Sequence, residues 1–108
     1  MDYGNRADGM TKGMGYFGEL KRPDGDVSTE ISVGVGINGK EMEIPLIVPT
    51  LTKKELNYLL STDVEAKGFF NNMPPSIMDK AYEHAQTRMK SGMSPFAGPD
   101  EIVEPPAK

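Results

Sequence analysis

The single histidine, His84, is the side chain best suited to acid–base chemistry at neutral pH. Asp79, Tyr82 and Glu83 lie near it in the sequence and could in principle transfer protons with it. His84 stands one position away from the apolar stripe of an expected helix, where an imidazole usually lies at an interface or faces solvent. No serine has the Gly-x-Ser-x-Gly setting of a hydrolase nucleophile. We therefore expect a protein that is not an enzyme.

A glycine-rich run at residues 34–39 superficially resembles a phosphate-binding loop. It lacks the helix that should follow and the Lys-Ser/Thr pair that would touch phosphates. Gly34 and Gly36 fall on one face of an expected strand, where they would let another backbone or an aromatic ring approach closely. We expect no nucleotide cofactor.

Asp24, Asp26 and Glu30 are the best candidates for a cation site with oxygen ligands. Their spacing differs from that of a calcium-binding loop, which favours a solvated hairpin turn. The chain has no cysteine, and its one histidine cannot form a histidine cluster, so disulfides and thiolate zinc sites are excluded. No metal is expected.

The size and charge of the chain limit its organisation and its partners. A chain of 108 residues has room for one domain with one core. Its net charge of −4 would repel a phosphate backbone, so nucleic acid is not expected to be a main partner. No run approaches the roughly 18 apolar residues that span a bilayer, and no secretion signal is present, so a soluble protein without a membrane partner is expected.

Two runs of alternating apolar residues predict a β-hairpin. The first extends from Val27 to Ile37 and the second from Met42 to Val48, and each has the period of two of a strand with one buried face. Asn38-Gly39 between them tolerates the positive φ angles of a type I′ turn. A two-residue turn fixes the register and pairs Val35 with Met42, Val33 with Ile44, and Ile31 with Leu46.

The same register places Pro45 opposite Ser32, at a position where the missing N–H would have pointed away from the partner strand. That strand is therefore expected to be an edge. Residues 15–22 could form an earlier strand, joined to the hairpin through a turn at residues 23–25. We expect a three-stranded antiparallel meander with residues 27–37 in the middle.

Two helices are expected after the sheet. Thr52 and Glu55 form a capping-box signal for a short helix at residues 53–60. A long helix is expected from Pro75 to Ser91, ending before Gly92. Its apolar residues form a stripe that would cover the sheet: Ile77, Met78, Ala81, Tyr82, Ala85 and Met89. The fold class is α+β, with the meander covered by one long and one short helix.

The remaining segments are expected to be arms of a single domain at residues 15–92. Residues 1–14 predict a flexible N-terminal arm, and the prolines of residues 93–108 predict an extended tail with separate apolar anchors. A loop at residues 62–73 presents an exposed pair of phenylalanines. Flexible methionines and aromatics outside the core suit adaptable contacts, and the predicted partner-binding residues are Met10, Met14, Phe69, Phe70, Met93, Phe96, Ile102 and Val103.

Four segments, at residues 15–25, 28–34, 44–52 and 94–97, together resemble a small domain found in virion-associated proteins of tailed bacteriophages. The resemblance spans roughly residues 13–97 and carries over no catalytic or binding residue. It implies a structural or accessory part of the virion, made in the host bacterial cytoplasm, that binds capsid, portal-neck or tail subunits in multiple copies. The two arms and the open strand edge are the expected docking surfaces. The alternatives are an acidic phage protein that inhibits a host enzyme, and an enzyme subunit that depends on His84.

Overall fold

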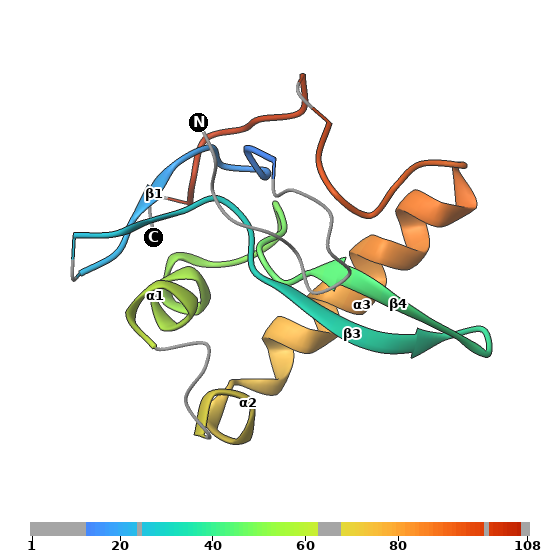
Figure 1. The fold of residues 1–108 in the computed structure, drawn as a ribbon, viewed down its shortest axis with the longest axis horizontal. Coiled ribbons are helices and arrows are strands. Elements are labelled where there is room, and N and C mark those ends of the chain that lie inside the picture. Colours follow the sequence, from blue (N-terminus) through green and yellow to red (C-terminus); the bar gives the residue numbers. More distant parts are fainter. Residues whose placement is uncertain (1–12, 24, 63–67, 99, 107–108) are drawn as a thin grey trace.

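The computed structural model describes residues 13–23, 25–62, 68–98 and 100–106 of the chain. Within these residues the fold is α+β, with two two-stranded antiparallel sheets and three helices (Figure 1). In chain order the elements are β1 (Leu20–Lys21), β2 (Val27–Ser28), β3 (Ser32–Ile37), β4 (Lys40–Pro45), α1 (Lys53–Ser61), α2 (Gly68–Asn72) and α3 (Pro75–Lys90).

The hairpin of β3 and β4 has the predicted turn and register. Asn38 and Gly39 both have positive φ angles, 53° and 80°, as a type I′ turn requires. The predicted cross-strand pairs are confirmed by Val35 opposite Met42, Val33 opposite Ile44, and Ser32 opposite Pro45. Beyond the last ladder pair, the Leu46 amide donates to the Ile31 carbonyl at 2.7 Å. The alternation of apolar residues and the Asn38-Gly39 turn therefore determine the β3–β4 hairpin.

The three-stranded meander is wrong, because β1 pairs with β2 in a separate sheet. The apolar alternation from Val27 to Ile37 is interrupted at residues 29–31, where three consecutive side chains are buried. The Thr29 hydroxyl donates to the Gly13 carbonyl at 2.6 Å, and the Glu30 carboxylate accepts from the Gly13 amide at 3.0 Å. The chain passes through the interior here, so one long strand cannot form.

The short helix begins with the predicted capping box. The Glu55 amide donates to the Thr52 hydroxyl at 3.2 Å, and the Thr52 amide donates to the Glu55 carboxylate at 2.8 Å. Glu55 also accepts from the Ser76 hydroxyl and from the Lys80 ammonium, the latter at 2.6 Å, which joins α1 to α3. Burial alone would raise its pKa, but the hydrogen bonds from Lys80, Ser76 and Thr52 lower the pKa of Glu55 to about 2.

The loop expected at residues 62–73 contains the short helix α2. Phe69 in this helix is fully buried, so the expectation of two exposed phenylalanines is wrong for Phe69, while Phe70 is 49% exposed. The Phe69 carbonyl accepts from the Tyr58 hydroxyl at 2.5 Å, and the rings of Phe69 and Phe70 meet edge to face at 5.0 Å. The one-turn helix fills the core with one ring of the pair and leaves the other outside.

The long helix covers the hairpin as predicted, lying behind β3 and β4 in Figure 1. Ile77, Ala81 and Ala85 on its apolar stripe are fully buried. After α3 the chain turns back across the molecule towards its N-terminal part near β1 (Figure 1). The C-terminal segment therefore reaches elements at the opposite end of the sequence.

Glycine is required at Gly15, where φ is +69° and an added Cβ would lie 1.9 Å from the Thr29 carbonyl oxygen. We expect Gly15→Ala to lower the free energy of unfolding by about 3 kcal/mol, through the left-handed backbone and the forced displacement of that carbonyl. Gly39→Ala, with a positive φ but no close neighbour, should cost only about 1 kcal/mol, and Gly36→Ala close to none. Urea unfolding of the three variants checks this order, and equal losses for Gly15→Ala and Gly39→Ala would contradict it.

Candidate functional site

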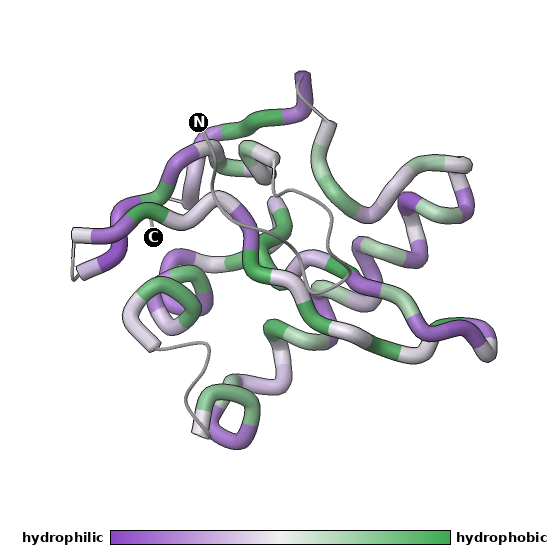
Figure 2. The backbone as a smooth tube through the Cα atoms, in the orientation of Figure 1, coloured by the Kyte–Doolittle hydropathy of each residue, from purple (hydrophilic) through white to green (hydrophobic). Residues whose placement is uncertain are grey.

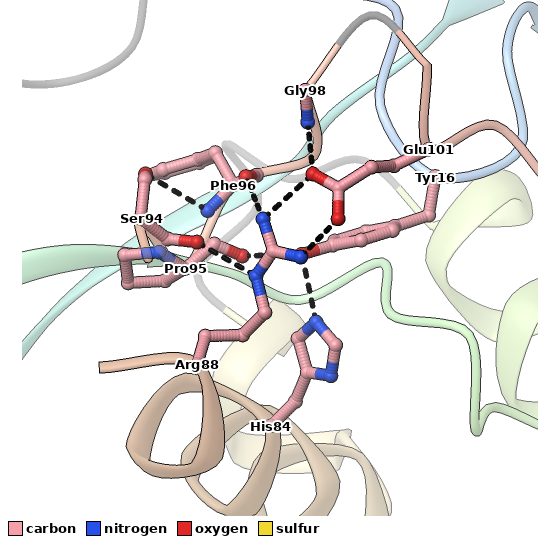
Figure 3. Close-up of polar contacts among 8 residues, drawn as sticks. All are labelled: Tyr16, His84, Arg88, Ser94, Pro95, Phe96, Gly98 and Glu101. Carbon is pink, nitrogen blue, oxygen red and sulfur yellow. Dashed lines mark hydrogen bonds and ion pairs between the residues drawn. The ribbon is translucent and has the colours of Figure 1, made fainter. Parts of the chain in front are cut away.

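Arg88, in the last turn of α3, holds the C-terminal segment through its guanidinium group (Figure 3). Its Nε donates to the Ser94 carbonyl at 2.8 Å, and one terminal nitrogen donates to the Phe96 carbonyl at 2.9 Å. Both terminal nitrogens bind the Glu101 carboxylate, one of them at 2.8 Å. Glu101 also accepts from the Gly98 amide at 2.6 Å. A planar fork of donors suits this combination of a carboxylate and two carbonyls.

The end of α3 directs the chain towards Arg88. The Met93 amide donates to the Arg88 carbonyl and the Gly92 amide to the Met89 carbonyl, at 2.9 and 3.0 Å, which is the hydrogen-bond pair of a Schellman motif. Gly92 has the positive φ of 75° that this motif places after the helix. The chain therefore reverses, so that residues 94–98 return past the side chain of Arg88.

Tyr16, from the N-terminal part of the chain, holds the same segment. We refer to residues 94–98 and 100–103 as the docked segment. The Tyr16 hydroxyl donates to the Pro95 carbonyl at 2.7 Å, and the Val103 amide donates to the Tyr16 carbonyl at 2.7 Å. The Tyr16 ring lies edge-on to His84, with ring centres 4.8 Å apart, and 5.7 Å from the Arg88 guanidinium carbon. The docked segment is thus attached at both ends of its length.

The titrating groups of this cluster have pKa values shifted by burial and by one another's charges. Burial raises the pKa of Tyr16 to about 12. Burial and the nearby Arg88 charge lower the pKa of His84, so its imidazole is neutral at pH 7. The Arg88 guanidinium and the Gly98 amide lower the pKa of Glu101 to about 2. Glu101 and Arg88 therefore remain an ion pair over the whole physiological range.

His84 has a positioning role in this arrangement. Its Nε2 lies 2.7 Å from the Tyr16 hydroxyl oxygen. Because the hydroxyl proton is donated to the Pro95 carbonyl, the neutral imidazole must carry its proton on Nε2 and donate it to that oxygen. The tyrosine hydroxyl is protonated and occupied on both sides, so the pair fixes the docked segment and leaves no activated nucleophile.

The structure places the predicted partner-binding residues in two environments. Phe69 is fully buried in the core, and Phe96 is only 9% exposed. Met10 lies outside the described residues. The exposed members of the set are Met14, Phe70, Met93, Ile102 and Val103.

Ile102 and Val103 are exposed although the backbone that carries them is fixed. Their exposed fractions are 44% and 46%. Figure 2 shows this hydrophobic stretch of the C-terminal segment between hydrophilic neighbours. A Cβ on Gly18 would lie 3.8 Å from Ile102, which places Ile102 beside the N-terminal part of the chain. The docked segment thus presents two adjacent apolar side chains to solvent from an ordered backbone.

The residues that hold this segment were missed by the sequence analysis. Tyr16, Arg88 and Glu101 are far apart in the sequence and belong to no repeating pattern. The only local signal was Gly92 followed by Pro95, which indicates a helix end and a change of direction but not its target.

The structure bears on the expected absence of a metal site and of a membrane span only within the described residues. Asp24 lies outside the described residues, and the Glu30 carboxylate accepts from the Gly13 amide. Among the described residues, no three acidic, histidine or cysteine side chains are grouped so that they could hold a metal ion. None of the helices in the same ranges has the length and hydrophobicity needed to cross a membrane.

Arg88→Lys keeps the positive charge but removes the fork of donors, so we expect the docked segment to open. Amide hydrogen exchange at Val103 should become about tenfold faster or more, because several charge-assisted hydrogen bonds are lost. Arg22→Lys is the matched control, since Arg22 binds Ser28 and the Thr62 carbonyl instead. Unchanged Val103 exchange in Arg88→Lys would show that the guanidinium does not hold the segment.

The lowered pKa of His84 predicts a pH dependence of stability. The unfolded chain binds a proton at His84 near pH 6.5, while the folded chain binds it only at lower pH, so folding becomes less favourable as pH falls through this range. Between pH 7.5 and pH 5 the wild type should lose more stability than His84→Gln, whose amide can still donate to Tyr16. Urea unfolding at both pH values measures the difference, and parallel losses would refute the assignment.

No protein-family model, curated protein or solved structure matches this chain.

Proposed function

We propose that this chain is a non-enzymatic structural or accessory protein of a bacteriophage particle, and that it docks on other virion subunits. One observation carries the proposal: a cluster of polar side chains fixes the docked segment while Ile102 and Val103 on it remain exposed. The resemblance of residues 13–97 to a domain of tailed-phage virion proteins supports the setting. A capsid-bound, neck or tail component fits both the exposed pair on the docked segment and the resemblance.

Pre-ordering the docked segment favours binding. A flexible tail must lose conformational entropy when it docks, whereas the bonds from Arg88 and Tyr16 impose that cost during folding. Exposed apolar side chains on a rigid support gain free energy when a partner covers them. Ile102 and Val103 are therefore better placed for recognition than the same pair on a free tail.

The N-terminal arm is proposed as a second contact. Gly13, where the described part of the chain starts, is held by Thr29 and Glu30, and Met14 beside it is exposed. The point at which the proposed arm joins the domain is therefore fixed. In this proposal the partners are capsid, portal-neck or tail subunits, several copies bind per particle, and neither nucleic acid nor a membrane is a main partner.

His84 has no catalytic part in the proposal. It donates to Tyr16, which in turn donates to the docked segment, so its contribution to function is the position of that segment.

The test compares Ile102→Ser/Val103→Ser with the swapped pair Ile102→Val/Val103→Ile, which keeps both positions apolar. Phage carrying each variant are purified, and copies per particle are counted by quantitative mass spectrometry. We expect the serine pair to lower incorporation about tenfold, since two partly buried contacts are worth roughly 1–2 kcal/mol, and the swapped pair to incorporate normally. The backbone amide at position 103 should keep its wild-type protection from hydrogen exchange in both variants, after correction for the intrinsic rate of the new residue, because its bond to the Tyr16 carbonyl is retained.

Two outcomes would overturn parts of the proposal. Normal incorporation of the serine pair would exclude Ile102 and Val103 as the docking surface. Absence of the wild-type chain from purified particles would exclude the virion role itself and favour the alternative, an acidic phage protein that inhibits a host enzyme.

A further inference from the structure

The outer edge of β4 has backbone hydrogen-bonding groups that bond to no other described residue. In the register of the hairpin, Ile31 and Leu46 form a hydrogen-bonded pair. Hydrogen-bonded and non-hydrogen-bonded pairs alternate along an antiparallel ladder, so every second residue of β4 counted from Leu46 bonds to β3. The N–H and C=O groups of Glu41 and Glu43 therefore point away from β3. Among the described residues, no other backbone group bonds to them. Pro45 also has its backbone turned away from β3, but it has no N–H group to donate, so the row of unpaired N–H groups along this edge ends at Pro45.

A groove lies along this free edge, with a volume of about 520 Å³. One wall is β4 with Glu41, Met42 and Glu43, and the other is the docked segment with Pro95 and Phe96. Met89 of α3 also lines it. Since Arg88 and Tyr16 fix the docked segment, the groove has two ordered walls. Its three-residue length along β4 corresponds to about 10 Å of extended chain.

Glu43, one of the residues that line the groove, has a buried carboxylate oxygen that forms no hydrogen bond with the described residues. Oε2 of Glu43 is inaccessible to solvent and has no hydrogen-bond partner in the part of the chain that the structure describes. The other oxygen of this carboxylate lies over Gly34, where an added Cβ would be 3.3 Å from it. A buried unpaired carboxylate oxygen is unfavourable, and a cationic hydrogen-bond donor would stabilise it. Glu41 adds a second negative charge on the same face of the hairpin.

We propose that the free edge of β4 accepts an extended segment of a partner protein as an added antiparallel strand, and that this segment alternates Lys or Arg with an apolar residue. In that register the cationic residues lie opposite Glu41 and Glu43, and the apolar residue between them lies opposite Met42, beside Met89. Backbone bonds to β4 provide affinity, and the alternation of charge and apolarity provides specificity.

A second copy of this chain is a poor occupant. Pairing two β4 edges would bring the carboxylates of Glu41 and Glu43 against the same residues of the other copy, and like charges directly opposite each other destabilise a sheet. The net charge of −4 further favours a basic partner segment.

Binding of the heptapeptide TKVKVKT, labelled with fluorescein and measured by fluorescence anisotropy on the full chain, tests the proposal. Backbone N-methylation of its lysines removes the donors that face β4, and we expect at least a tenfold loss of affinity. Methylation of its valines blocks only the outer edge and should leave affinity within about threefold. On binding, the amides of Glu41 and Glu43 should become protected from hydrogen exchange.

Protein variants distinguish the contribution of side-chain charge to peptide affinity from that of backbone hydrogen bonds. Glu43→Gln should weaken binding about tenfold, because a charge-assisted hydrogen bond is lost, while Glu104→Gln, on an exposed part of the C-terminal segment, should not. The inference is overturned if TKVKVKT does not bind at millimolar concentration, or if both methylated peptides bind equally, which would indicate charge attraction alone. It rests on the proposed docking role but can fail separately: particle incorporation that depends on Ile102 and Val103, without peptide binding, would leave the virion role standing.

Discussion

The guanidinium group of Arg88 is the constraint on which both proposed contact surfaces depend. It binds two backbone carbonyls and one carboxylate from a stretch of eight residues, and a lysine could not satisfy that geometry. The docked segment it fixes carries the exposed pair Ile102 and Val103 on one part and forms a wall of the groove beside β4 on another. One side chain therefore supports both proposed contact surfaces.

Buried polar groups join elements that the two small sheets could not hold together. Glu55 completes the cap of α1 and also binds Lys80 of α3, while Thr29 and Glu30 hold Gly13 where the chain crosses the interior. The contacts of Glu55 are favourable because its charge has several partners, which offsets the cost of removing it from water. The apolar stripe of α3 supplies the core, and these polar contacts determine how the segments around it are placed.

Local signals in the sequence predicted the elements whose causes are local. The turn at Asn38-Gly39 fixed a register that the structure confirms, and Thr52 with Glu55 marked the start of α1. The meander failed because residues 29–31 are all buried, and the bonds from Thr29 and Glu30 to Gly13 that bury these polar side chains leave no trace in the apolar alternation. Of the candidate site, Ile102 and Val103 were predicted from the sequence as partner-binding residues, and both side chains are exposed. The cluster of Tyr16, His84 and Arg88 could not be predicted, since its members are brought together only by the tertiary fold.

The separation of these residues along the chain also has a consequence for folding kinetics. The bond from Tyr16 to Pro95 spans 79 positions, and the one from Tyr16 to His84 spans 68, whereas the β3–β4 turn closes over two residues. Contacts between residues far apart in the sequence cost more chain entropy to form until other contacts have shortened the intervening loop. The docked segment is therefore expected to settle late, after the hairpin and helices have formed. For that interval a newly made chain has one wall of the β4 groove missing, so assembly competence would be acquired in the final step of folding.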